Sequence, residues 1–371
     1  MKSGLLSRAL AMQVIASLGL PDLEDDTPYL AFALVFGIAL FSSYLLTPFA
    51  QRFGLNYGLV SVPGGRHQGH GRIARTGGLA LYFSFTLAAV IAQFLPIERT
   101  DTKEITRFIG LLLGGTVVFI IWLLDDKYDL PSYVQFAGQF LAGAIAVAFL
   151  IIIETFNNPL TGNSVSTGPD ALVMLISIFW IALMMNTVNF LDGSDGLAAG
   201  VVCIAALMIF VHAAFRLDQV SVSLLPLALV GTTLGFLPYN FHPAKVFMGG
   251  GAPYLGYVLA VLSIIGGAKM ATILLVMGLP LVDLGWQASS RLLRGKSPFS
   301  GDRGHLHFRL QALGLSPKII ALGYYAFCAC FGLIALTTNS QLFKLLALAV
   351  MFFIVSIVFL VMTWLQRKTQ E

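Results

Sequence analysis

Long runs of apolar residues dominate this sequence and limit what it can fold into. Several approach the roughly 20 residues that a helix needs to cross a bilayer. Only 11% of the residues are charged, against about 25% in a typical soluble protein. The sequence predicts an all-α, polytopic transmembrane helical bundle that forms a single domain over residues 1–371. About 11 helices are expected, near residues 29–49, 78–96, 108–124, 133–153, 171–189, 197–215, 219–238, 254–267, 270–286, 318–336 and 343–365.

The segment before the first run and the overall charge give further expectations. Residues 1–27 contain Lys2 and Arg8 and are mildly amphipathic, which favours a helix on the membrane surface. The net charge of +4 is small and gives no indication of a nucleic-acid partner. The cysteines lie inside apolar runs and lack the spacing of a metal site.

The connections between the expected helices divide into two sides of the membrane. One side carries 14 of the 22 Lys and Arg residues. Positive residues favour the cytoplasm, so this side is expected to be cytoplasmic. All the notable polar clusters fall on it, which predicts an active site at the cytoplasmic face of the membrane.

The stretch Asn186–Gly196 directly follows a strongly apolar run. Its two amides and two carboxylates recur every third residue: Asn186, Asn189, Asp192 and Asp195. If the helix continues through them, these side chains fall near one face and can converge at its end. The alternative is a polar helix end that faces water.

Two further acidic features lie at membrane edges. Asp125 and Asp126 are adjacent at the end of an apolar run, and Asp129 follows. Asp283 stands among apolar residues near the end of another run. Carboxylates in such places are costly to desolvate, which indicates a bound cation or proton handling rather than an ordinary solvated helix end.

Basic residues gather in two loops on the same side. Residues 63–78 contain Arg75 among glycines, and the loop 287–317 contains a group of alternating cations: Arg303, His305, His307 and Arg309. Two histidines are too few for a zinc site. A pocket for phosphate or carboxylate fits better, although ordinary positive loop charge remains an alternative.

Together these clusters indicate a reaction class. Carboxylates and amides suit Mg²⁺, with Mn²⁺ as a substitute, and magnesium commonly bridges carboxylates and substrate phosphates. The clusters also contain cationic side chains, which bind phosphate, and they lie beside a bilayer. The sequence therefore predicts phosphoryl transfer between a nucleotide substrate and a lipid phosphate. A transporter would place its polar groups near the bilayer midplane, and an intramembrane aspartyl protease would need two embedded aspartates.

At these residues the sequence resembles a known family, the polyprenyl-phosphate N-acetylhexosamine-1-phosphate transferases. That group includes enzymes that initiate enterobacterial-antigen and teichoic-acid synthesis and the phospho-MurNAc-pentapeptide translocase. The matching motifs run in order from Pro63 to Leu310, and the forms Asp-Asp-x-x-Asp (125–129) and Asp-Arg-Gly-His (302–305) are more similar to the initiating enzymes. The pentapeptide-translocase activity remains the alternative.

The resemblance implies a magnesium-dependent transfer of sugar-1-phosphate from a UDP-sugar to undecaprenyl phosphate, with UMP released. Its implied catalytic residues are Asp125, Asp126 and Asp283, and Asp283 and Asn189 lie nearest the metal. The implied substrate-binding residues are Arg75, Asp129, Asn186, Asp192, Asp195, Arg303, His305, His307 and Arg309. The donor sugar, the glycan pathway and a homodimer stay open.

Three positions depart from the family pattern. The family usually has Asp after Met-Gly, where this chain reads Met-Gly-Gly-Gly from Met248. Phe308 replaces a histidine, and Gly69 stands at a usual histidine position. The missing acid is compatible with an altered donor choice, a weakened enzyme or an inactive relative. Because the central acids are intact, an active enzyme with an altered sugar preference is favoured.

Overall fold

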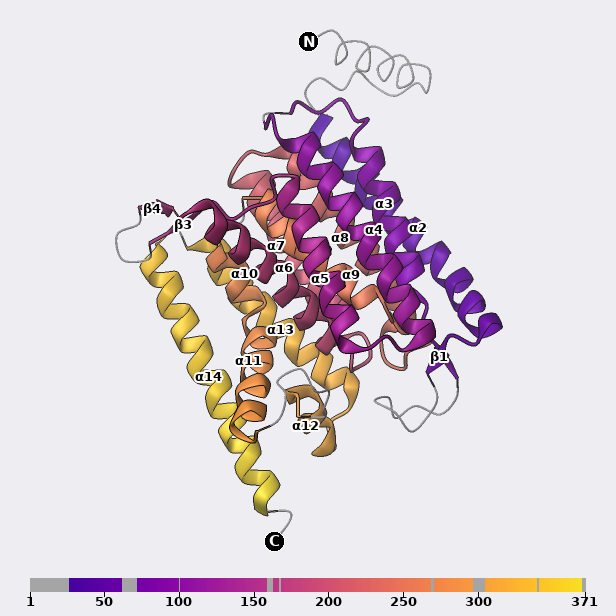
Figure 1. The fold of residues 1–371 in the computed structure, drawn as a ribbon, viewed down its shortest axis with the longest axis vertical. Helices are drawn as coiled ribbons and strands as arrows, with labels where there is room; N and C mark the ends of the chain where they lie inside the picture. Colours follow the sequence, from indigo (N-terminus) through magenta and orange to yellow (C-terminus); the bar gives the residue numbers. More distant parts are fainter. Residues whose placement is uncertain are drawn as a thin grey trace.

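The computed structural model describes residues 27–61, 72–99, 101–158, 163–166, 168–267, 270–295, 304–338 and 340–368. These residues form a bundle of helices (Figure 1). The helices are α2 (Thr27–Tyr57), α3 (Gly77–Ala92), α4 (Glu104–Tyr128), α5 (Ser132–Ala148), α6 (Asp170–Leu191), α7 (Leu197–Phe215), α8 (Val220–Asn240), α9 (Gly251–Ile265), α10 (Met270–Val276), α11 (Gly278–Leu293), α12 (Leu306–Ala312), α13 (Pro317–Thr337) and α14 (Gln341–Lys368).

Two short antiparallel strand pairs accompany the helices. In the first pair, β1 (Val60–Ser61) pairs with β2 (Ile73–Ala74). In the second, β3 (Thr155–Asn157) pairs with β4 (Ser164–Ser166). Each strand is only two or three residues long, and the other elements of the described chain are helices, so the predicted all-α architecture is confirmed.

Seven of the described helices are long and apolar enough to cross a membrane: α2, α4, α6, α7, α8, α13 and α14. Shorter apolar helices, α3, α5 and α9, lie among them. Each expected run overlaps a helix, but the ninth divides at Met277 into α10 and α11. Large apolar side chains such as Phe49 and Phe353 remain exposed on the outer helices, as expected where a protein faces lipid.

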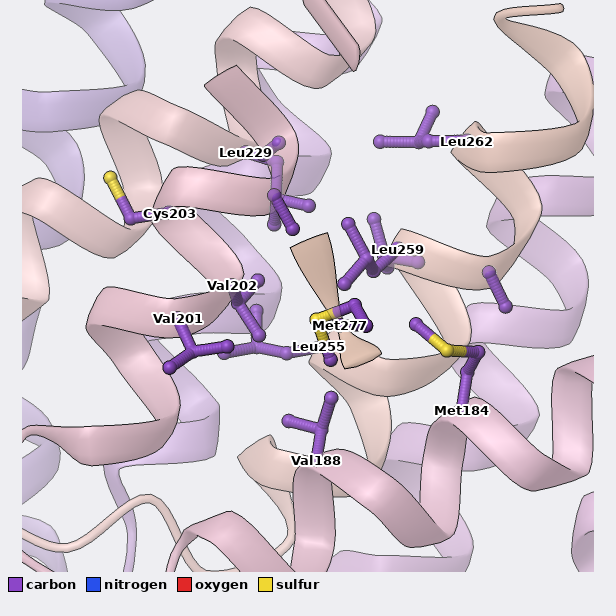
Figure 2. Packing of buried hydrophobic residues seen from close by; sticks show 14 of the residues in the cluster. Met184, Val188, Val201, Val202, Cys203, Leu229, Leu255, Leu259, Leu262 and Met277 are labelled. Atoms are coloured by element: carbon purple, nitrogen blue, oxygen red, sulfur yellow. The ribbon is translucent and has the colours of Figure 1, made fainter. Parts of the chain in front are cut away.

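The centre of the bundle is α9, which packs against α3, α4, α6 and α7. Figure 2 shows Leu255 and Leu259 of α9 close to Met184 of α6 and Val202 of α7. A Cβ at Gly256 would lie only 2.6 Å from the Cα of Met185, so glycine allows α6 and α9 to approach closely. Small residues at helix contacts have this role in membrane bundles.

One end of the bundle gathers the helix ends that carry the polar motifs. In Figure 1 it is the lower end, where β1 and α12 lie. There α4, α6 and α8 end, while α3, α7 and α9 begin. We call this the site end. That it faces the cytoplasm stays a prediction from the positive charge in its loops.

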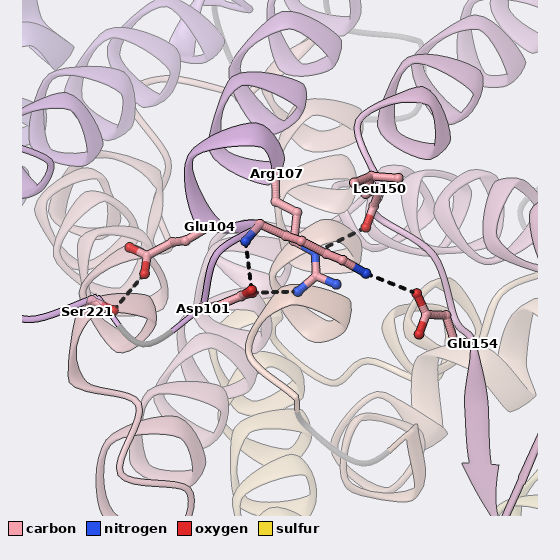
Figure 3. Close-up of polar contacts among 7 residues, drawn as sticks. Asp101, Glu104, Arg107, Leu150, Glu154 and Ser221 are labelled. Carbon is pink, nitrogen blue, oxygen red and sulfur yellow. Dashed lines mark hydrogen bonds and ion pairs between the residues drawn. The ribbon is translucent and has the colours of Figure 1, made fainter. Parts of the chain in front are cut away.

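The opposite end is held by a polar network at the start of α4 (Figure 3). Glu104 is buried, accepts a hydrogen bond from the Ser221 hydroxyl of α8 at 2.8 Å, and lies 3.5 Å from Arg99. Arg107 forms a 2.8 Å ion pair with Asp101. The buried carboxylate therefore has both a hydrogen bond and a cation, as buried charges require.

Two expected boundaries are corrected by the structure. The loop expected at 287–317 starts later, because α11 continues to Leu293, and it contains α12. The expected surface helix at 1–27 lies outside the described residues except for Thr27, which begins α2.

Candidate functional site

The carboxylate of Asp126, in the last turn of α4, is held at the junction of three segments. Arg75, before α3, places Nη2 3.3 Å from Asp126 Oδ1. The backbone N–H of Gly250, at the start of α9, donates to Asp126 Oδ2 at 2.7 Å. Asp126 is almost fully buried while Arg75 is 38% exposed. A charged group buried with a cation and an N–H donor is satisfied and held in position.

Glycine is required where the loop before α9 passes Asp126. Gly249 has a φ of +54°, and a Cβ there would collide with the Arg75 carbonyl and the Asp126 carboxylate. Gly250 occupies the position where the family usually has Asp. A Cβ at Gly250 would lie 2.7 Å from the Cβ of Trp122 and 2.9 Å from its backbone carbon. The contact with α4 therefore leaves no room for an acid at this position.

Asp125 has different partners from its neighbour. Its Oδ1 accepts hydrogen bonds from the Leu130 N–H and from Gln135 Nε2, both at 2.9 Å. Asp129 ends α4 with a φ of +46°, and its N–H bonds to the Asp125 carbonyl. Asp125 thus fixes the turn from α4 to α5, while Asp126 faces Arg75 and α9.

The turn between α6 and α7 contacts several other elements at the site end. Helix α6 ends at Leu191, close to the expected end at residue 189, so the helix does not continue through Asp192 and Asp195 and the four side chains do not share one helical face. The turn is instead held from other elements. Gln311 of α12 donates to the Ser194 hydroxyl at 3.0 Å, and the Tyr325 hydroxyl of α13 donates to the Gly196 carbonyl at 2.5 Å.

The Asp192 carboxyl interacts electrostatically with Arg75, Asp126 and Asp195. Desolvation raises the pKa of the Asp192 carboxyl well above its ordinary value of 3.8. Arg75 opposes this rise in the pKa, whereas Asp126 and Asp195 add to it. Asp192 therefore lies near both Arg75 and Asp126, and neighbouring like charges favour a bound cation or proton.

The two amides of α6 behave differently from each other. Asn186 forms a reciprocal amide pair with Gln139 of α5, with distances of 2.7 and 3.1 Å. This pair locks α5 against α6. Asn189 is half-buried, and its side chain forms no hydrogen bond within the described part of the chain. Of the two, Asn189 keeps its oxygen available.

His242 is a residue of the site that the sequence analysis did not single out. Its Nδ1 lies 2.7 Å from Asp195 Oδ2, which also accepts from the Ala244 N–H at 3.1 Å. The imidazole is 37% exposed. No local pattern could reveal this pair, because its members are 47 positions apart. A carboxylate on Nδ1 fixes the ring and leaves Nε2 for another group.

A second polar group surrounds Asp283 on α11. Its two oxygens lie 3.2 Å from the Leu306 N–H, and Oδ2 lies 3.3 Å from His305 Nδ1. Gln287, one turn later, donates to the Gly304 carbonyl at 2.5 Å. Phe190 of α6 stacks on the His305 ring with centroids 4.7 Å apart. Asp283 therefore holds the start of α12 beside the end of α6.

His307 is fully buried against the α6–α7 turn. A Cβ at Gly193 would lie 2.6 Å from its Nε2. Burial lowers the pKa of His307 to about 3, and neighbouring His305 adds to this. Neither ring nitrogen has a hydrogen-bond partner within the described part of the chain. Buried polar atoms without a protein partner are uncommon and often mark a binding site.

Arg309 points away from these residues. Its Nε donates to the Gly304 carbonyl at 2.7 Å, its Nη1 donates to Thr363 of α14 at 3.1 Å, and its guanidinium lies over Phe359. The expected group of Arg309 with the histidines is therefore split between two faces of α12. Arg303 lies outside the described residues.

The acids around Arg75 do not form a complete metal site by themselves. Within the described ranges, no three His, Cys, Asp or Glu side chains stand together as a metal-binding group. Magnesium commonly takes only one or two carboxylates from the protein and completes its shell with substrate phosphates and water. Asp126 and Asp192 are donors of that kind.

Comparison with known proteins decides the family. A model described as glycosyl transferase family 4 matches residues 108–267. The chain is 31% identical over 323 residues to the probable undecaprenyl-phosphate N-acetylglucosaminyl 1-phosphate transferase of Bacillus subtilis (strain 168), which covers 85% of this chain and 87% of that protein. The chain belongs to glycosyl transferase family 4.

Other relatives lie in both branches considered above. The decaprenyl-phosphate N-acetylglucosaminephosphotransferase of Mycolicibacterium smegmatis is 29% identical over 91% of this chain and 88% of its own length. A phospho-N-acetylmuramoyl-pentapeptide-transferase of Staphylococcus haemolyticus is 30% identical over 64% of this chain and 77% of its own. The expected family is confirmed, and the N-acetylglucosamine relatives match more of the chain.

Proposed function

We propose that this protein transfers N-acetylglucosamine-1-phosphate from UDP-N-acetylglucosamine to a polyprenyl phosphate. The observation that carries the proposal is that Asp126 pairs with Arg75 and that both act on Asp192, with Asp195 next to Asp192, at one end of a membrane bundle in a chain of this family. A lipid phosphate can reach such an end from the bilayer, and a nucleotide can reach it from water.

The proposed reaction balances without a redox partner. An oxygen of the polyprenyl phosphate forms a bond to the β-phosphorus of the donor. The bond from that phosphorus to the oxygen of UMP breaks, and UMP leaves with the electron pair. The lipid phosphate is already largely ionised near neutral pH, so in-line positioning and neutralisation of charge supply most of the acceleration.

Residues at the site end have distinct proposed tasks. Asp126, fixed by Arg75 and Gly250, and Asp192 would hold Mg²⁺, with Asn189 beside them; the sequence prediction of Asp283 as a ligand is tested separately. Mg²⁺ supplies neutralisation of phosphate charge when bound. His305 and the neutral ring of His307 would donate hydrogen bonds to the donor's diphosphate or sugar.

The deciding experiment measures UMP release by purified protein with magnesium, undecaprenyl phosphate and a panel of donors. The panel contains UDP-GlcNAc, UDP-GalNAc and UDP-MurNAc-pentapeptide. Lipid-dependent release with UDP-GlcNAc, lost with EDTA and restored by magnesium, is expected. Release only with the pentapeptide donor would favour the translocase activity. Absence of UMP release with every donor, from protein that is folded, would indicate an inactive relative.

A matched pair of variants assigns the metal ligands. Asp192→Asn is expected to raise the magnesium concentration needed for half-maximal activity, since it removes a charged oxygen ligand. Asp283→Asn is expected to lower turnover with little change in that concentration, because Asp283 holds Leu306 and His305. The reverse pattern would assign Asp283, rather than Asp192, as a metal ligand.

A further inference from the structure

A cavity of about 730 Å³ lies between α11 and α14; neither Asp126 nor Asp283 lines it. Helices α11 and α14 run side by side in Figure 1. The volume falls in the range of about 300–1,000 Å³ that is typical of ligand pockets. Its described lining residues are Leu281, Val282, Gly285, Trp286, Ser289, Ser290, Leu293, Arg294, Arg309, Phe352 and Thr363.

The lining changes character along α11. Leu281, Val282 and Trp286 form its apolar part, while Arg294 ends α11 at the site end of the bundle. The thirteen helical steps from Leu281 to Arg294 extend about 20 Å. Arg294 is exposed and its side chain forms no hydrogen bond or ion pair within the described ranges, and Arg309 also borders the cavity. An apolar channel that ends in two cations matches an anionic lipid.

The cavity and the acids use different faces of α11. Asp283, Gln287 and Arg291 are buried and follow one another at four-residue intervals, so they share one face. Val282, Trp286, Ser289 and Leu293 lie on another face, toward the cavity. A molecule in the cavity is thus separated by α11 from Asp283, and no acid of the Asp126 cluster lines it. This favours a lipid that binds without reacting.

We propose that this cavity binds an anionic phospholipid of the surrounding bilayer. One acyl chain would lie along Trp286 and Phe352, and the phosphate would face Arg294 and Arg309. Each Arg near an anionic membrane surface contributes about a fivefold preference for the charged lipid. The neutral hydroxyls of Ser289 and Ser290 can add hydrogen bonds to the head group.

Arg309 connects this cavity to the start of α12, where His305 and His307 lie. Its Nε and the amide of Gln287 both donate to the Gly304 carbonyl, at 2.7 and 2.5 Å. Gly304 directly precedes His305, whose Nδ1 faces Asp283. A phosphate that holds the Arg309 guanidinium would therefore hold the start of α12. This consequence for turnover rests on the proposed function, whereas lipid binding does not.

The binding test uses the fluorescence of Trp286. Protein is reconstituted in phosphatidylcholine vesicles that contain increasing fractions of brominated phosphatidylglycerol or, separately, brominated phosphatidylcholine. Trp364, exposed on α14, is replaced by Phe in all samples, and Trp122 and Trp180 are buried. Quenching is expected to saturate with both lipids. The fraction of brominated phosphatidylglycerol that gives half-maximal quenching should be at least about fivefold lower than the corresponding fraction of brominated phosphatidylcholine.

Two glycines give a matched pair of variants. Gly285 lines the cavity and has no atom within 4 Å of an added Cβ, so Gly285→Phe fills the space without a clash at the backbone. Gly323 on α13 is equally open and exposed. Gly285→Phe is expected to abolish the saturable quenching and Gly323→Phe to leave it intact. Arg294→Gln is expected to reduce the preference for phosphatidylglycerol about fivefold.

Three results would overturn the proposal. They are equal quenching by the two brominated lipids, unchanged saturable quenching in Gly285→Phe, and displacement of brominated phosphatidylglycerol by a smaller fraction of polyprenyl phosphate. The last would make polyprenyl phosphate the occupant. Turnover in the same vesicles is a separate readout. Phosphatidylglycerol is expected to raise it in the native chain and in Gly323→Phe, but not in Gly285→Phe. Absence of turnover with intact quenching would reject the proposed function and leave the lipid site standing.

Discussion

At the scale of single residues, two adjacent aspartates have different surroundings. Asp125 accepts from Leu130 and Gln135 and fixes a turn, whereas Asp126 faces Arg75 and the Gly250 N–H. Adjacent residues on a helix point about 100° apart, so one pair of acids can serve two elements. This separates a structural contribution of Asp125 from the proposed metal-binding role of Asp126.

We expect Asp126→Asn to fold and to lose activity. Asn keeps an oxygen that can accept from the Gly250 N–H, but it removes the charge that faces Arg75. UMP release should fall by at least ~100-fold, the order seen when an electrostatic catalytic group is removed. Asp170→Asn, an exposed acid at the start of α6, is the control and should keep normal turnover. Normal turnover in Asp126→Asn would remove this carboxylate from the reaction.

Gly250 offers a steric prediction about the position where the family usually has Asp. Its φ of −59° suits any residue, so only space limits it, and Trp122 fills that space. Gly250→Ala should therefore destabilise the protein by about 1–3 kcal/mol through overpacking. Gly285→Ala, on an open helical face, should stabilise it by up to ~1 kcal/mol. Thermal unfolding in detergent compares them, and equal unfolding temperatures would contradict the close contact with α4.

At the scale of elements, α12 explains why part of the site could not be predicted. Alternating His305, His307 and Arg309 suggested one cationic pocket. Residues two apart on a helix point about 200° apart, so His307 packs on Gly193 while Arg309 reaches α14. His242 gave no signal either, because its partner is distant in sequence. The acid motifs were predictable because each lies at the end of an apolar run.

The packing of α12 should weaken in acid through His307. Its folded pKa of about 3 lies below the ordinary 6.5, so below about pH 6.5 the unfolded chain binds a proton that the folded chain does not. Stability is present above that pH and is lost as the pH falls toward 3. At pH 5 the loss is about 2 kcal/mol. His307→Leu cannot titrate, so its unfolding temperature should fall less between pH 8 and pH 5. Parallel curves for the two proteins would show that His307 is not the titrating group.

At the scale of the whole molecule, the order of helix ends places the polar motifs together. Helices α4, α6 and α8 end, and α3, α7 and α9 begin, at the same end of the bundle. The sequence predicted this grouping because apolar runs alternate direction across a membrane. It could not predict that α9 is the buried centre, since a run of apolar residues does not distinguish contact with lipid from contact with protein.

The orientation of the whole bundle is tested by labelling from each side of the membrane. Tyr128 is 61% exposed at the site end, and Asp170 is exposed at the opposite end. If the site end is cytoplasmic, as its positive loops favour, a membrane-impermeant maleimide should label Asp170→Cys but not Tyr128→Cys in spheroplasts. Inside-out vesicles should reverse the pattern, and the native chain, whose cysteines lie within helices, measures background. Labelling of Tyr128→Cys in spheroplasts would put the acids on the outer side, where a cytosolic nucleotide donor could not reach them.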